Sequence, residues 1–273
     1  MLDEVCPDIP IAIQSSDGHS VLINSKAIEI LGATEEILEK YPKGEIKYDE
    51  NGEPTGLVSE KPAHDILLEI QPTMTELKEF FLAWQEFAFK NGYTATAYAG
   101  NTLLIKNNTD AAFLELAKEK KLKLRTYPFW HIGPEEKDIK GAVKEAAKFK
   151  EENDDEYYSF VGFKILLDGV VEAHTAWLIE DYADEPGYHG VEGFNDHDKI
   201  VELIKTASEC GLCVHAHSIG DCATKFMLDC IEDSIALTKD MDQRNAICHL
   251  QQVRNEDIQR FADLNVVAIV APL

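Results

Sequence analysis

The chain has 273 residues, of which 45% are hydrophobic and 28% charged, proportions typical of a folded globular protein. Its formal net charge of −24 argues against binding to nucleic acid or to anionic membrane surfaces. No apolar run approaches the ~20 residues of a membrane helix, and the N-terminal MLDEVCPDIP lacks the basic start and apolar core of a secretion signal. We therefore expect a cytoplasmic protein with no nucleic-acid or membrane partner, whose cysteines are reduced.

The first part of the chain, residues 1–70, predicts a small mixed α+β subdomain. Residues 9–32 are typical of a strand, a turn and a helix. Residues 45–60 predict a β-hairpin with Asn51 and Gly52 at its turn, because this dipeptide accepts the positive φ angles of a tight hairpin. We expect this subdomain to pack on a larger unit formed by residues 71–273.

Strands and amphipathic helices alternate through the rest of the chain. The first helix, residues 75–92, follows Thr73 and Glu76 in capping-box spacing and ends at Gly92. The predicted strands that follow are 93–100, 122–132, 158–169, 212–220, 245–250 and 266–273. The predicted helices between them are 108–121, 137–153, 196–211, 222–237 and 255–265.

This alternation predicts an α/β protein built from parallel βα units. A TIM barrel of the (β/α)8 type needs eight strands in about 250 residues, whereas the pattern here provides fewer and would leave open sheet edges. Two architectures remain: an open doubly wound sheet, or an incomplete TIM barrel, which the functional residues favour. Exposed edges invite contact between chains, so a homodimer is a further expectation.

Candidate functional side chains lie near the ends of the predicted strands, where parallel βα folds place their working residues. His217 and His249 end successive strands, and His215 shares the face of His217 because side chains alternate along a strand. One buried histidine is more often a core residue, but two strands that end in histidine favour metal ligands. Lys164 lies in an apolar strand and needs a carboxylate, a covalent adduct or a metal-linked modification. Asp168 shares its face and would be the carboxylate of a simple salt bridge.

Three further residues are weaker candidates for substrate contacts or for support of the site. His19 belongs to an Asp-Gly-His segment that is also typical of a turn. Asp221 opens a helix and is equally compatible with an N-cap. Thr175 lies in the loop 169–194, far longer than the usual βα loop of about 2–6 residues. We interpret this loop as a wall or lid of the substrate pocket.

Several segments together resemble the metal-dependent amidohydrolase superfamily, and within it the amidohydrolase-3 (YtcJ-like) branch. They occur in the family's order and reach from about residue 17 to residue 272. The segments are DGHSVLINSKAIEILG, GEPTGLVSE, FKILLDGVVEAHTAWL, VHAHSIGDCAT and CHLQQVRNEDIQRFADLNVVAIVAP.

The resemblance implies a TIM-barrel hydrolase with one or two divalent metal ions, zinc above all. A metal-activated water would attack an amide or related C–N bond of a small-molecule substrate. By motif position the metal ligands would be Lys164, His217 and His249, and in related members the lysine is carbamylated.

Two parts of the family's pattern are absent from the chain: the His-x-His pair of the first barrel strand and the strand-eight aspartate, the usual general base. The predicted strands correspond to barrel strands 2–7. We therefore expect an internal fragment of a longer enzyme, inactive by itself. From the residues alone, two rivals remain open: a Schiff-base lyase or aldolase that uses Lys164, and a non-catalytic barrel whose histidines fill the core.

Overall fold

The computed structural model describes residues 2–15, 20–30, 46–59, 63, 72–99, 108–238, 241 and 243–270. The chain forms two compact units. Met1–Leu77 and Thr102–Thr109 make up the first, and Lys78–Asn101 and Asp110–Leu273 the second. In the parts of the chain covered by these ranges, no helix is long and apolar enough to cross a membrane.

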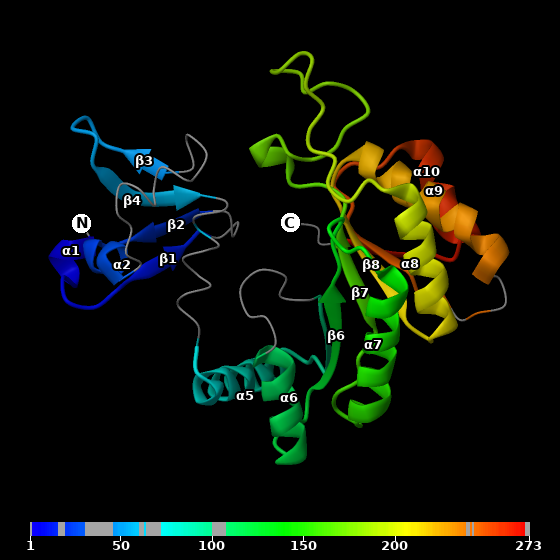
Figure 1. The fold of residues 1–273 in the computed structure, drawn as a ribbon, viewed down its shortest axis with the longest axis horizontal. Helices are drawn as coiled ribbons and strands as arrows, with labels where there is room; N and C mark the ends of the chain where they lie inside the picture. The colour runs from blue at the N-terminus through cyan, green and yellow to red at the C-terminus, as the bar shows by residue number, and fades with distance from the viewer. Residues whose placement is uncertain are drawn as a thin grey trace. The chain divides into compact units, whose positions relative to one another are not determined.

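The first unit contains a four-stranded antiparallel sheet in the order β1-β2-β4-β3 (Figure 1). Its strands are β1 (Ala12–Gln14), β2 (Ser20–Ile23), β3 (Ile46–Tyr48) and β4 (Pro54–Ser59), and its helices are α1 (Leu2–Val5) and α2 (Ser25–Ile30). The predicted hairpin is strands β3 and β4, and Gly52 has the expected positive φ of 85°. Residues 9–32 hold two strands where the sequence predicted one. The buried core of the unit includes Val21, Ile23 and Val58.

The second unit contains a six-stranded parallel sheet whose strands lie in chain order, β5 to β10. The strands are β5 (Ala95–Tyr98), β6 (Arg125–His131), β7 (Gly162–Leu166), β8 (Cys213–Ser218), β9 (Ala246–His249) and β10 (Val267–Val270). The helices are α5 (Met74–Lys90), α6 (Asn108–Lys118), α7 (Ile139–Asn153), α8 (His197–Glu209), α9 (Asp221–Thr238) and α10 (Asn255–Asp263). A short 3₁₀ helix, η1 (Val171–Ala173), lies in the long loop after β7.

Helices α7 to α10 lie on one side of this sheet (Figure 1). The main hydrophobic core forms between them and the strands, with Phe163, Val214 and Ile247 from the sheet and Val143 and Leu203 from the helices. Strands in chain order with helices on one side form an arc of a (β/α) barrel, whereas a doubly wound sheet reverses its strand order. The predicted incomplete TIM-type barrel is confirmed, and the doubly wound alternative is excluded.

The other face of the sheet carries polar side chains. Residues paired across parallel strands point to the same side, and Lys164 is paired with His131 on one neighbour and with His215 on the other. Two residues after His215 on β8, His217 is paired with Cys248 of β9. The strand alternation that buries Phe163 and Val214 against the helices therefore turns this polar set toward the barrel interior.

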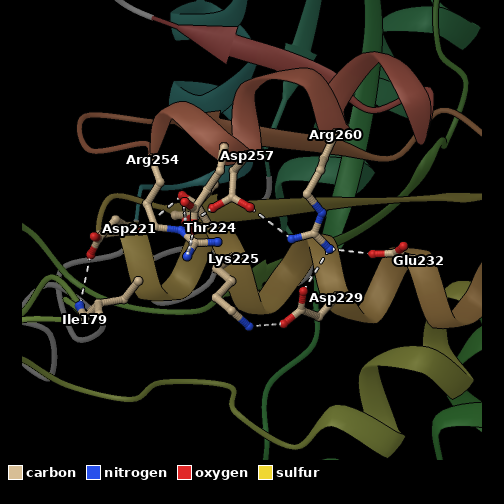
Figure 2. Close-up of polar contacts among 12 residues, drawn as sticks. Ile179, Asp221, Thr224, Lys225, Asp229, Glu232, Arg254, Asp257 and Arg260 are labelled. Atoms are coloured by element: carbon tan, nitrogen blue, oxygen red, sulfur yellow. Dashed lines mark hydrogen bonds and ion pairs between the residues drawn. The ribbon is translucent and has the colours of Figure 1, made fainter.

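A network of ion pairs joins α9 and α10 (Figure 2). Arg260 donates to Asp257 at 3.0 Å, to Asp229 at 2.8 Å and to Glu232 at 2.7 Å. Arg254, just before α10, donates to Asp257 at 2.6 Å. The Asp257 residue is fully buried. These contacts fix α10 on α9 next to the end of β9, and so support the rim where the polar side chains lie.

Candidate active site

Lys164 is the buried centre of the polar set. It stands in the middle of β7, is 6% exposed, and its Nζ donates to Cys248 Sγ at 2.9 Å. Burial lowers the pKa of the Lys164 amine, and the Cys248 thiol opposes this shift. The carboxylate partner that the sequence suggested, Asp168, makes its contacts elsewhere. Within the described chain, the hydrogen bond of this buried amine therefore goes to a thiol rather than to a carboxylate.

His215 stands beside Lys164 on the adjacent strand and is also 6% exposed. Its ring meets the ring of Phe129 edge-on, with centroids 5.1 Å apart. Within the described chain, its buried Nε2 has no hydrogen-bond partner. Burial, followed by the charge on Lys164, lowers the pKa of His215 to about 4, so the imidazole is neutral at neutral pH.

His217 and His249 come together at the end of their strands, with ring centroids 4.5 Å apart. His249 is paired in register with Ser218, so regular alternation would send its side chain away from His217. The backbone at His249 instead has a positive φ of 76°, which breaks the alternation. Burial of part of the ring, and then the charge on Lys164, lower the pKa of His249.

A neighbouring carbonyl and carboxylate orient the His217 ring. Nε2 of His217 lies 2.9 Å from the carbonyl oxygen of Gly169 and 3.4 Å from Asp168 Oδ1. The hydrogen bond to the carbonyl requires the proton on Nε2, which makes Nδ1 the basic nitrogen of the neutral ring. Metal-binding histidines are commonly held in this way through their second nitrogen.

Asp168 ties three segments together. Its carboxylate accepts N–H hydrogen bonds from Ile219 at 3.0 Å, from Gly220 at 2.7 Å and from Trp177 at 3.0 Å. Burial raises the pKa of Asp168 to about 6, against the opposing effect of these N–H groups. The close approach needs glycine at 220, because a Cβ there would lie 1.9 Å from the Trp177 carbonyl oxygen.

The remaining candidates hold the long loop rather than meet the polar set. Thr175 Oγ1 accepts from Val170 N at 2.9 Å and donates to Val170 O at 3.2 Å. Asp221 is the first residue of α9 and accepts from Ile179 N at 3.0 Å (Figure 2). Both therefore anchor the loop 169–194. His19 lies outside the described residues.

Two residues of the interior face were missed by the sequence analysis. His131 ends β6 and is paired with Lys164, and the same signal that selected His217 and His249, a histidine at a strand end, was present there. For Cys248 the sequence predicts no more than a reduced thiol. No sequence signal distinguishes it, because its contact with Lys164 depends on the register of strands far apart in the chain.

The donor set fits a divalent metal ion when Lys164 is included. Among the described residues, no three or more His, Cys, Asp and Glu side chains are arranged to hold a metal ion by themselves. His217 and His249 supply two adjacent imidazoles, and in the described part of the chain the buried Nε2 of His215, beside Lys164, has no hydrogen-bond partner. A carbamylated lysine is an oxygen ligand and would add the third donor.

The whole chain, residues 1–273, matches the sequence family described as "Amidohydrolase family". It is 28% identical over 279 residues to Protein LONG AFTER FAR-RED 3 of Arabidopsis thaliana, covering 99% of the chain and 46% of that protein. It is 29% identical over 274 residues to YtcJ of Bacillus subtilis (strain 168), covering 99% of the chain and 49% of that protein. The chain thus spans about half the length of these curated relatives.

Solved structures give the same result for the fold. A crystal structure of an uncharacterized metal-dependent hydrolase from Pyrococcus furiosus superposes with a TM-score of 0.71 at 26% identity, over 96% of the chain and 50% of that structure. One from Pyrococcus horikoshii OT3 gives a TM-score of 0.71 at 22% identity, over 96% of the chain and 49% of that structure. Both likenesses agree with an incomplete barrel.

Proposed function

Because the chain belongs to the amidohydrolase family, we propose that it carries the central part of a metal-dependent hydrolase that cleaves an amide or related C–N bond of a small molecule. One observation carries this proposal: His217 and His249 lie with ring centroids 4.5 Å apart at the strand ends, close to the buried Lys164. In parallel βα barrels this rim holds the reacting groups. The net charge of −24 disfavours polyanionic substrates.

We assign Lys164, His217 and His249 as the metal ligands. Two imidazoles and an oxygen donor suit zinc, as one ion or as a pair. Lys164 would act in its carbamylated form, because an ammonium group repels a cation whereas a carbamate attracts it. When bound, such an ion lowers the pKa of water toward ~7 and polarises the substrate carbonyl.

The other residues of the rim hold these ligands and the loop in place. Gly169 and Asp168 fix the ring of His217, so that its Nδ1 keeps one direction. Asp168 also binds the backbone of Trp177, which fixes the loop against the end of β8. The loop then forms a wall of the substrate pocket and excludes water from one side of the reaction.

The experiment that tests the ligand assignment is zinc content after gel filtration. The double variant His217→Ala/His249→Ala should lose zinc, with an affinity loss larger than the roughly 10–100-fold cost of removing an outer-shell partner. His189→Ala is the matched control, because His189 is an exposed loop histidine next to Glu192, and it should keep the wild-type zinc content. Unchanged zinc in the double variant would exclude the assignment.

A second candidate function is a Schiff-base lyase or aldolase. The observation that favours it is the burial of Lys164, which lowers the pKa of its amine and so increases the neutral, nucleophilic form. Reduction with borohydride in the presence of short aldehydes and 2-oxo acids, followed by peptide mass spectrometry, separates the two functions. An adduct on Lys164 would favour the lyase, and its absence in a zinc-containing protein would favour the hydrolase.

A further inference from the structure

Two neighbouring donors on the interior face of the barrel lack a strong acceptor. Lys164 and His215 are paired across β7 and β8, and each is 6% exposed. In the described part of the chain, Lys164 Nζ hydrogen-bonds to Cys248 Sγ, and thiol sulfur is a weak acceptor. Over the same residues, the buried Nε2 of His215 has no hydrogen-bond partner. A buried polar atom without a partner is costly, so a group that supplies acceptor oxygens would stabilise this part of the interior face.

The carboxylate at this end of the sheet already has its own hydrogen-bond donors. The Asp168 carboxylate accepts from three backbone N–H groups and lies against His217. The contact between His215 and Phe129 involves the ring edge and does not supply an acceptor oxygen. Neither Asp168 nor Phe129 therefore serves His215 Nε2, and a group that joins the site can supply the acceptor.

We propose that His215 is a positioning residue for a carbamate on Lys164, and that its Nε2–H donates to a carbamate oxygen. This inference rests on the proposed function, in which carbamylated Lys164 is a ligand. In the modification step, the lone pair of the neutral Lys164 amine forms a bond to the carbon of carbon dioxide. One C=O π pair moves to oxygen, and the nitrogen loses a proton to solvent water. The carbamate then supplies the oxygen that His215 lacks, and strand pairing places the two side chains on the same face.

The test uses the 273-residue chain with zinc and ¹³C-labelled bicarbonate, and the carbamate is measured by ¹³C NMR. Lys164→Met removes the amine and assigns the signal. His215→Gln keeps an N–H donor near the position of Nε2, whereas His215→Asn places its donor near Nδ1. The wild type and His215→Gln should show the carbamate, and His215→Asn should lose about tenfold in occupancy, the effect of one lost buried hydrogen bond.

A second measurement separates positioning from simple packing. Added bicarbonate should raise the melting temperature of the wild type and of His215→Gln, and should leave that of His215→Asn unchanged. If His215→Asn does not unfold cooperatively, His215→Leu replaces it as the variant without a donor at the Nε2 position, since leucine fills a similar volume and buries no polar atom.

The outcomes distinguish this inference from the proposed function. Wild-type carbamate occupancy in the variant without a donor overturns the role of His215 and leaves the metal site intact. A zinc-containing wild type without a carbamate also overturns it, with His217 and His249 still supported as ligands. If the wild-type protein contains neither zinc nor a carbamate, both the metal-ligand assignment and the role of His215 are contradicted.

Discussion

Asp168 shows how one buried side chain can organise the rim of the barrel. It lies just after β7, and its oxygens accept from the backbone of Trp177 in the long loop and of Ile219 and Gly220 after β8. It also lies 3.4 Å from Nε2 of His217. Hydrogen bonds to a charged group contribute about 1.5–3 kcal/mol each. The residue therefore couples the position of the loop to the orientation of a proposed metal ligand.

Replacing Asp168 by asparagine should lower the free energy of unfolding by about 3 kcal/mol, because an amide NH₂ would face backbone N–H groups that now bind a carboxylate. Urea denaturation measures this change. Asp221→Asn is the matched control: Asp221 accepts one hydrogen bond, from Ile179 N, and should lose about 1 kcal/mol or less. Equal losses in the two variants would contradict the organising role of Asp168.

At the same scale, the sequence predicted the face on which a side chain lies better than it predicted the contacts of that side chain. His215 and His217 lie on one face because side chains alternate along a strand, whereas Lys164 joins them through the register between β7 and β8. The contact between Lys164 and Cys248 does not, because it depends on how strands far apart in the chain align. The position of the His249 ring depends on a positive φ angle at this residue. No local sequence pattern around a histidine predicts such an angle.

At the scale of elements, helix α10 depends on ion pairs as well as on apolar contacts. Asp257 is fully buried and is held by Arg254 and Arg260. Burial by itself would raise the pKa of Asp257, but the hydrogen bonds from the two arginines outweigh burial and lower it. A carboxylate with a lowered pKa stabilises the fold at pH values above its unfolded pKa of about 3.9. That stabilisation is lost as the pH falls through the lower, folded value.

Asp257→Asn should therefore be less stable than the wild type at pH 7 by about 2 kcal/mol, below the 3–5 kcal/mol of a fully buried pair because both arginines are partly exposed. As the pH falls below about 4, the difference between the two proteins should close. Denaturation at a series of pH values measures it. Asp263→Asn, which changes an exposed residue bonded to Gln259, should show no such gap; a gap for Asp257→Asn that is constant with pH would refute the argument.

Sequence patterns were most informative about the type and order of the helices and strands. The strands and helices from α5 to β10 appear in the predicted order, because apolar strands and capped amphipathic helices have distinct periods. Element ends were less accurate: the strand predicted at 158–169 is β7, Gly162–Leu166. The extra residues still bond to the neighbouring strands, but outside the regular ladder: Ser159 N and Val161 N donate to β6, and Leu167 N donates to His217 O of β8. Periodicity does not show where a regular ladder ends.

For the molecule as a whole, charge is the dominant surface property. The chain has 50 acidic and 26 basic residues. Many basic residues are already used in ion pairs such as those of Arg260, so the excess carboxylates repel one another across the surface. Salt shortens the range of this repulsion from about 10 Å at 0.1 M to about 3 Å at 1 M.

Raising NaCl from about 0.05 M to about 0.5 M should raise the melting temperature by about 2–4 °C, equivalent to about 1 kcal/mol in a chain of this size. Differential scanning fluorimetry measures the shift, and KCl at equal ionic strength should give the same value if screening is the cause. A melting temperature that falls with salt would show that the ion pairs, rather than the excess negative charge, dominate the response.

The chain-order arrangement of β5 to β10 bears on how the protein is made. As the polypeptide leaves the ribosome, each new strand finds its partner in the strand synthesised just before it, which keeps the search for pairing local. Lys164 emerges well before Cys248 and both rim histidines. Its amine therefore meets cellular carbon dioxide and water first, and the later strands close around whatever state it has reached.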